Sequence, residues 1–169
     1  MIAFSPGIAQ GCFELLGIAR RSQLTLAAIS EAFPQLCAMS TGELLAFAQE
    51  MGWMRAGDGA IAVVTAAGQR VTAHAKYEMN LRQALLDFVE TRRPSWVQNA
   101  MSGRSRVLAF AGAGIAQLLV DADLTASTDD DVVSFWDALA ARARGSHNAA
   151  LTEIGRRGEK LSLAYETTR

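Results

Sequence analysis

The fold is decided by a stretch in the first half of the chain, Trp53-Met54-Arg55-Ala56-Gly57-Asp58-Gly59, continued by Ala60-Ile61-Ala62-Val63-Val64-Thr65. Glycine adopts the positive φ angles of a tight turn without steric cost. The residues after the turn are rich in Ile and Val, which favour a strand. The stretch therefore predicts a β-hairpin with a glycine-rich turn.

Three helices are predicted before this hairpin. The first spans residues 6–21, begins at Pro6 and carries apolar residues at helical spacing: Ile8, Cys12, Leu15, Leu16 and Ala19. The second is short, spans residues 24–33 and stops at Pro34.

The third helix is predicted to begin at Ser40 or Thr41 and to end at Gly52. Glu43 stands three residues after Ser40, which is the spacing of a capping box. We expect this helix to expose polar and acidic side chains: Thr41, Glu43, Gln49 and Glu50.

Three helices followed by a hairpin are the element order of a winged helix, which we assign to residues 1–75. The stretch from Val64 to Val71 also resembles the segment that follows the wing in many bacterial winged-helix proteins, where a new helix begins. The predicted fold class is mainly α, a winged helix followed by a helical domain.

The helical domain is predicted to occupy residues 76–169. A helix marked by Tyr77, Leu81, Leu85 and Phe88 ends before Pro94. Further helices are predicted over residues 107–122, from the aspartates at 129–131 to Gly145, and around Ile154 to Tyr165, with loops at 123–131 and 145–150.

Charge gives a mixed indication about nucleic acid. The net charge is −1, and residues 1–75 hold four arginines against five acids. The third helix, which enters the major groove in many winged-helix proteins, has no Lys or Arg. Because phosphate contacts supply most non-specific affinity, this argues against ordinary operator binding.

The basic residues cluster after residue 91, and no acid interrupts the stretch 92–106. Arginines and an aromatic ring suit a surface that follows phosphates and stacks on a base. The candidate nucleic-acid-binding residues are Arg55, Arg92, Arg93, Trp96, Arg104 and Arg106. The alternative is a solvated face whose charges are balanced by the twelve acids of the same half.

Other chemistries find little support. Cys12 and Cys37 lack metal-ligand spacing, and we expect both to be buried thiols in a reducing cytoplasm. Gly112-Ala113-Gly114 lacks the third glycine of a dinucleotide loop. We expect no metal, no cofactor and no catalytic set. No apolar stretch is long enough for a membrane span, so we expect a cytoplasmic protein without a membrane partner.

The last residues, Gly155-Arg156-Arg157-Gly158-Glu159-Lys160-Leu161-Ser162-Leu163-Ala164-Tyr165-Glu166, carry a family resemblance together with Arg92-Arg93-Pro94-Ser95-Trp96, Gly103-Arg104 and Phe135-Trp136-Asp137. Over roughly residues 50–169 the chain resembles bacterial proteins with a NO VEIN-type C-terminal domain. In that family the helix with Gly155, Gly158 and Glu159 opens a restriction-endonuclease-like fold, often associated with defence against foreign DNA.

The resemblance also draws attention to the catalytic residues of the family that this sequence lacks. A nuclease of that type needs an Asp and then a Glu-x-Lys on adjacent strands to hold a divalent metal. The chain stops at Arg169, before any such strands. The leading expectation is therefore a non-catalytic DNA-targeting or regulatory module of a defence-associated nuclease-like protein. The alternatives are a winged-helix interaction or dimerisation module that binds no DNA, and a small transcriptional regulator.

Overall fold

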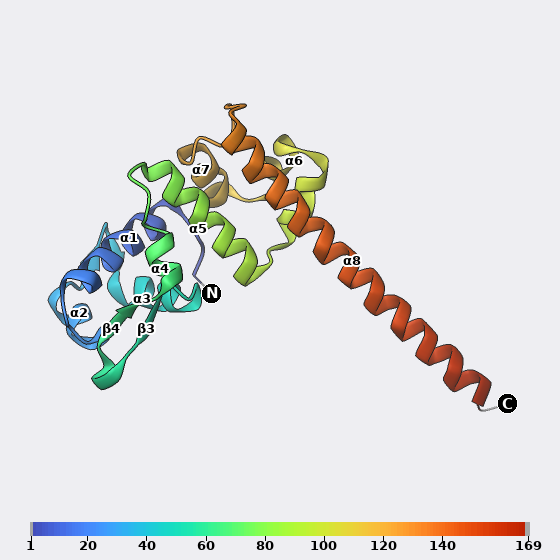
Figure 1. Ribbon diagram of the computed structural model, residues 1–169, viewed down its shortest axis with the longest axis horizontal. Coiled ribbons are helices and arrows are strands. Elements are labelled where there is room, and N and C mark those ends of the chain that lie inside the picture. Colours follow the sequence, from blue (N-terminus) through green and yellow to red (C-terminus); the bar gives the residue numbers. More distant parts are fainter. Residues whose placement is uncertain (1, 168–169) are drawn as a thin grey trace.

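The computed structural model describes the backbone of residues 2–167 and the side chains of residues 2–145 and 147–161 (Figure 1). The fold is mainly helical, as predicted. The first part comprises α1 (Pro6–Arg21), α2 (Leu26–Ala32), β1 (Gln35–Leu36), β2 (Met39–Ser40), α3 (Thr41–Glu50), β3 (Met54–Ala56), β4 (Ala62–Val64) and α4 (Ala66–Arg70). The second comprises α5 (Tyr77–Arg92), a 3-10 segment η2 (Ser95–Ser102), α6 (Arg104–Phe110), α7 (Ala113–Asp121) and α8 (Asp130–Thr167).

The predicted hairpin is present. Strands β3 and β4 are antiparallel, and Arg55 stands opposite Val63. Gly59 occupies the turn with a φ of 62°, which a side chain would make costly. Thr25, between α1 and α2, forms a β-bridge with Ile61 and so ties the helices to the hairpin.

Helix α4 follows the hairpin because Thr65 caps it, with the Thr65 hydroxyl accepting a hydrogen bond from the Gly68 amide at 3.2 Å. Gly68 lies directly against the backbone of Trp53: a Cβ on Gly68 would stand 2.1 Å from the Trp53 carbonyl oxygen. Arg20 of α1 donates to the Gly68 carbonyl at 2.9 Å. The turn after the hairpin is therefore locked to both the hairpin and α1.

An aromatic cluster joins α5 to the first part of the chain. The Phe47 ring stacks on Phe4 at a centroid distance of 5.1 Å and meets Trp53 edge-on at 5.9 Å. Phe88 of α5 lies 5.0 Å from Phe4. The indole nitrogen of Trp53 donates to Asp87 of α5 at 2.8 Å. Residues before and after position 75 therefore share one core.

Four details differ from the sequence prediction. Thr41 is buried, with its hydroxyl donating to the Phe33 carbonyl, and the Ser40 side chain makes no capping bond. Cys37 is only half-buried and donates to Glu14 at 3.0 Å. Thr41 and Cys37 lie at the short β1–β2 hairpin and the start of α3. The sequence does not predict this hairpin.

The other two differences concern glycines. The predicted helix over 107–122 is two helices, because Gly112 adopts a φ of 81° between α6 and α7. Gly145 does not end a helix: α8 runs on to Thr167, and the predicted loop at 145–150 is helical. A glycine inside a helix costs only about 1 kcal/mol, which good helix formers on both sides can offset.

Helix α8 has two parts with different surroundings. Its first part packs on η2 and α5 through buried apolar residues: Val132, Phe135, Trp136, Leu139 and Ala143. Its second part leaves the body and projects away from it (Figure 1). At 1.5 Å per residue the 38 residues of α8 are about 57 Å long.

Candidate interaction surface

Arg92 contributes its whole guanidinium group to the interior. Its Nε and Nη2 donate to the two carboxylate oxygens of Glu50 at 2.7 and 2.6 Å, and Nη1 donates to the Ile2 carbonyl. The guanidinium carbon also lies 5.1 Å from the Phe47 ring centroid and 5.3 Å from that of Phe88. The Arg92 guanidinium holds the pKa of Glu50 below its usual range. Arg92 therefore connects α5, α3 and the N-terminal segment.

Arg104 and Trp96 are also committed to packing. Arg104 donates to the Ser127 carbonyl at 2.6 Å and lies over the Trp136 ring at 5.7 Å. Trp96 is half-buried against the core. The stretch 92–106 thus gives part of its basic and aromatic side chains to joining η2, α6 and α8.

The remaining predicted nucleic-acid-binding arginines are exposed. Arg55 is on β3 and donates only to the neighbouring Ala56 carbonyl, at 3.3 Å. Arg106 lies over the Phe110 ring at 5.6 Å. Arg93 has a left-handed backbone that ends α5, and no described side chain forms a hydrogen bond or ion pair with it. Of the predicted set, Arg92, Trp96 and Arg104 are engaged in packing, and Arg55, Arg93 and Arg106 are exposed.

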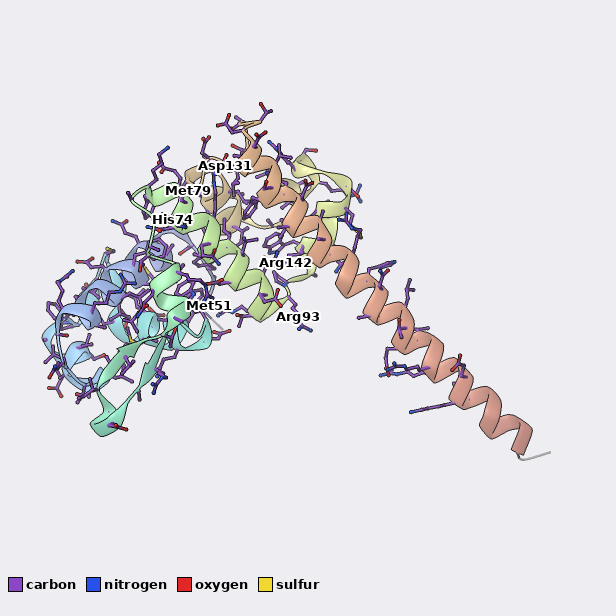
Figure 2. The ribbon with its side chains drawn as sticks, in the orientation of Figure 1. Met51, His74, Met79, Arg93, Asp131 and Arg142 are labelled. Carbon is purple, nitrogen blue, oxygen red and sulfur yellow. The ribbon has the colours of Figure 1, made fainter. Side chains whose placement is uncertain are left out.

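An open groove lies where α8 leaves the body. Its volume is about 460 Å³, and Arg93 and Arg142 line it from opposite sides together with apolar and small residues of α5, η2 and α8 (Figure 2). Arg142 is paired with Glu90 at 3.2 Å. The groove is open and carries one ion pair and one further arginine, so it is a surface feature of mixed character.

Another ion pair connects the start of α8 to α5. Arg82 of α5 is buried, donates to the Ala122 carbonyl at 2.8 Å and pairs with Asp131. The Arg82 guanidinium lowers the pKa of Asp131.

Burial raises the pKa of the Cys12 thiol to about 12, which leaves it protonated at neutral pH.

The most exposed large aliphatic side chains lie on the projecting part of α8. Leu151 is 53% exposed, Ile154 65% and Leu161 72%. Gly155, Gly158 and Glu159, the residues of the family resemblance, lie on the same segment, and a Cβ on either glycine would meet no atom within 4 Å. Single exposed leucines are ordinary, whereas these three exposed side chains lie at helical spacing along one segment.

This surface differs from the sequence prediction, in which a helix ends at Gly145. The sequence predicts a separate last helix around Ile154 to Tyr165, which includes Ile154 and Leu161 but not Leu151. The spacing of apolar residues in the sequence does not show whether another part of the chain covers that helix.

None of the described helices is long and apolar enough to cross a membrane. Within the described residues, no three His, Cys, Asp or Glu side chains gather where they could hold a metal ion.

Comparisons of the chain with protein-family models, curated proteins and solved structures return no match. The resemblance to proteins with a NO VEIN-type domain therefore stays a prediction that rests on the short motifs in the sequence.

Proposed function

We propose that this protein is a non-catalytic dimerisation module whose contact surface is the projecting part of α8. The observation that carries the proposal is the exposure of Leu151, Ile154 and Leu161 on a helix that stands clear of the body. A second helix laid along these side chains would remove them from water, which is the main favourable term in association. Of the functions considered from the sequence, this matches the interaction module.

We further propose that residues 1–75 form a winged-helix unit within this module. Three helices, the β3–β4 hairpin and the Thr25–Ile61 bridge support that assignment. The exposed side of α3 carries Glu43, Gln49 and Glu50 and no basic residue. Glu50 is moreover held by Arg92, so this helix favours a structural or protein-binding role.

Light scattering over about 1–200 μM protein tests the dimerisation proposal. We expect a monomer–dimer equilibrium for the parent chain, with a dimer dissociation constant in the micromolar range. Ile154→Asp places a charge on the exposed stripe in both copies and should weaken the dimer by about 100-fold or more. Circular dichroism should show that the variant keeps its helices.

Thr152→Asp is the matched control, since Thr152 is exposed on the same segment but off the apolar stripe. It should leave the dimer intact. A parent chain that stays monomeric throughout this range, or a dimer that Ile154→Asp does not weaken, contradicts the proposal.

A second candidate function, DNA contact, is favoured by the exposed Arg55 on the hairpin. In this case the parent chain should bind labelled duplex DNA at 50 mM salt and lose affinity steeply at 200 mM, as measured by fluorescence anisotropy. Arg55→Glu should reduce the affinity by about tenfold, whereas Arg144→Glu, at an exposed position on α8, should change it less. Absence of binding at 50 mM salt contradicts this second candidate function. It also contradicts the expectation that the chain targets a nuclease-like domain to DNA.

A further inference from the structure

The stripe on the projecting part of α8 has the spacing of a helix-pairing seam. Leu151, Ile154, Gly158 and Leu161 follow one another at intervals of three, four and three residues. These are the intervals of two heptads, the spacing that keeps one seam facing a partner helix, with glycine at one of the four seam positions. Upstream, the buried residues Val132, Trp136, Leu139 and Ala143 also alternate by four and three. The stripe therefore adjoins the face by which α8 already packs on the body.

We propose, on the basis of the dimerisation function above, that the occupant of this seam is the same segment of a second copy, running antiparallel. In this register Leu151 lies opposite Leu161 of the second copy, and Ile154 lies opposite Gly158 of the second copy. The twofold axis repeats both contacts, as a self-complementary interface requires.

Size complementarity supports this register. Gly158 interrupts the stripe, and the space around it is open. The antiparallel register fills each glycine position with an Ile154 side chain, so that large faces small at both central positions. Packing of large against small residues lets two helices approach closely without leaving a void. A parallel register would place Gly158 against Gly158 and leave both sites empty.

The placement of the body supports the antiparallel direction. Helix α8 packs on η2 and α5 through its first part, and its projecting part stands clear (Figure 1). Two parallel helices would bring the two bodies to the same end of the seam, where each occupies the face adjoining the stripe. Two antiparallel helices place the bodies at opposite ends and leave the seam free along its length.

Charges beside the seam are compatible with this pairing. Arg157 flanks the stripe near the position of the twofold axis, so two Arg157 side chains approach each other there. Each is paired with Glu153 of its own helix at 3.0 Å. Two such pairs placed side by side alternate in sign, which offsets the repulsion between the arginines.

Spin labels at position 148 test the arrangement without altering the seam. Asn148 is exposed and lies off the stripe. The label is attached to Asn148→Cys in a Cys37→Ser chain; Cys12 stays, because it is fully buried. In the proposed register residue 148 lies opposite residue 164 of the second copy. Pulsed electron paramagnetic resonance should therefore give a separation of about 24 Å along the axis, from 16 residues at 1.5 Å each.

The outcomes separate this inference from the function on which it rests. A dimer whose labels lie about 10 Å apart, the spacing of two packed helices, is parallel and overturns the antiparallel arrangement while dimerisation stands. A separation well above 40 Å places the contact elsewhere and overturns the arrangement as well. A monomer by light scattering overturns both proposals.

Discussion

Gly68→Ala is expected to lower the free energy of unfolding by about 3 kcal/mol or more, the largest effect of a single added methyl group in this chain. The new Cβ would stand 2.1 Å from the Trp53 carbonyl oxygen and 2.8 Å from a Val64 methyl carbon. The first of these atoms is backbone, so the hairpin or α4 has to move. Such a shift also pulls on the Gly68 carbonyl that Arg20 binds.

Urea unfolding followed by circular dichroism measures this effect. The measurement is made in the Ile154→Asp background, so that association does not add to the stability. Gly42→Ala is the control, because its Cβ would meet only the Ser40 hydroxyl at 3.6 Å. Alanine is the better helix former, so the control should be neutral or more stable by up to about 1 kcal/mol. Equal midpoints for the two variants would contradict the close approach at Gly68.

Arg92→Met is expected to cost roughly 2–3 kcal/mol of stability. The substitution leaves Glu50 without its two charge-assisted hydrogen bonds and the Ile2 carbonyl without its donor. It also removes the guanidinium group from between the Phe47 and Phe88 rings. Glu50 is 40% exposed and can be solvated again, which keeps the loss below that of a fully buried pair.

The neighbouring residue supplies the control for Arg92. Arg93→Ala should change stability by less than about 0.5 kcal/mol, because Arg93 is exposed and ends α5 without a described side-chain partner. Chemical unfolding of both variants gives the comparison. Equal and small losses of stability in the two variants would mean that the Arg92 contacts do not stabilise the fold. Arg92 would then be an ordinary surface arginine.

These two arginines show what the sequence could and could not predict about the candidate site. A run of adjacent basic residues was interpreted as one surface, although helical spacing already separates them. Arg92 follows Leu81, Leu85 and Phe88 at intervals of four, three and four residues, on the buried face of α5. Arg93 falls just beyond the end of the helix. Periodicity applied to polar residues would have found this difference.

Helices with one apolar stripe and a distinct cap were predicted well, as α1 and α5 show. The hairpin was predicted because glycines at 57 and 59 can adopt the positive φ angles of a tight turn, and Gly59 has a φ of 62° there. The effect of glycines inside predicted helices was harder to predict. Gly112 has a φ of 81° and separates α6 from α7, whereas Gly145 stays helical within α8, and residue type alone does not distinguish the two.

The unbroken course of α8 has a mechanical consequence. No loop, proline or change of backbone conformation separates Leu161 from Trp136, whose ring is wedged between Phe135 and Arg104 and whose indole nitrogen holds the Leu124 carbonyl at 2.9 Å. Helices curve only gently where nothing kinks them, so the direction of the first part of α8 is carried over to the exposed stripe. The contacts of Trp136 with the body therefore help to set the direction in which the projecting part of α8 leaves it.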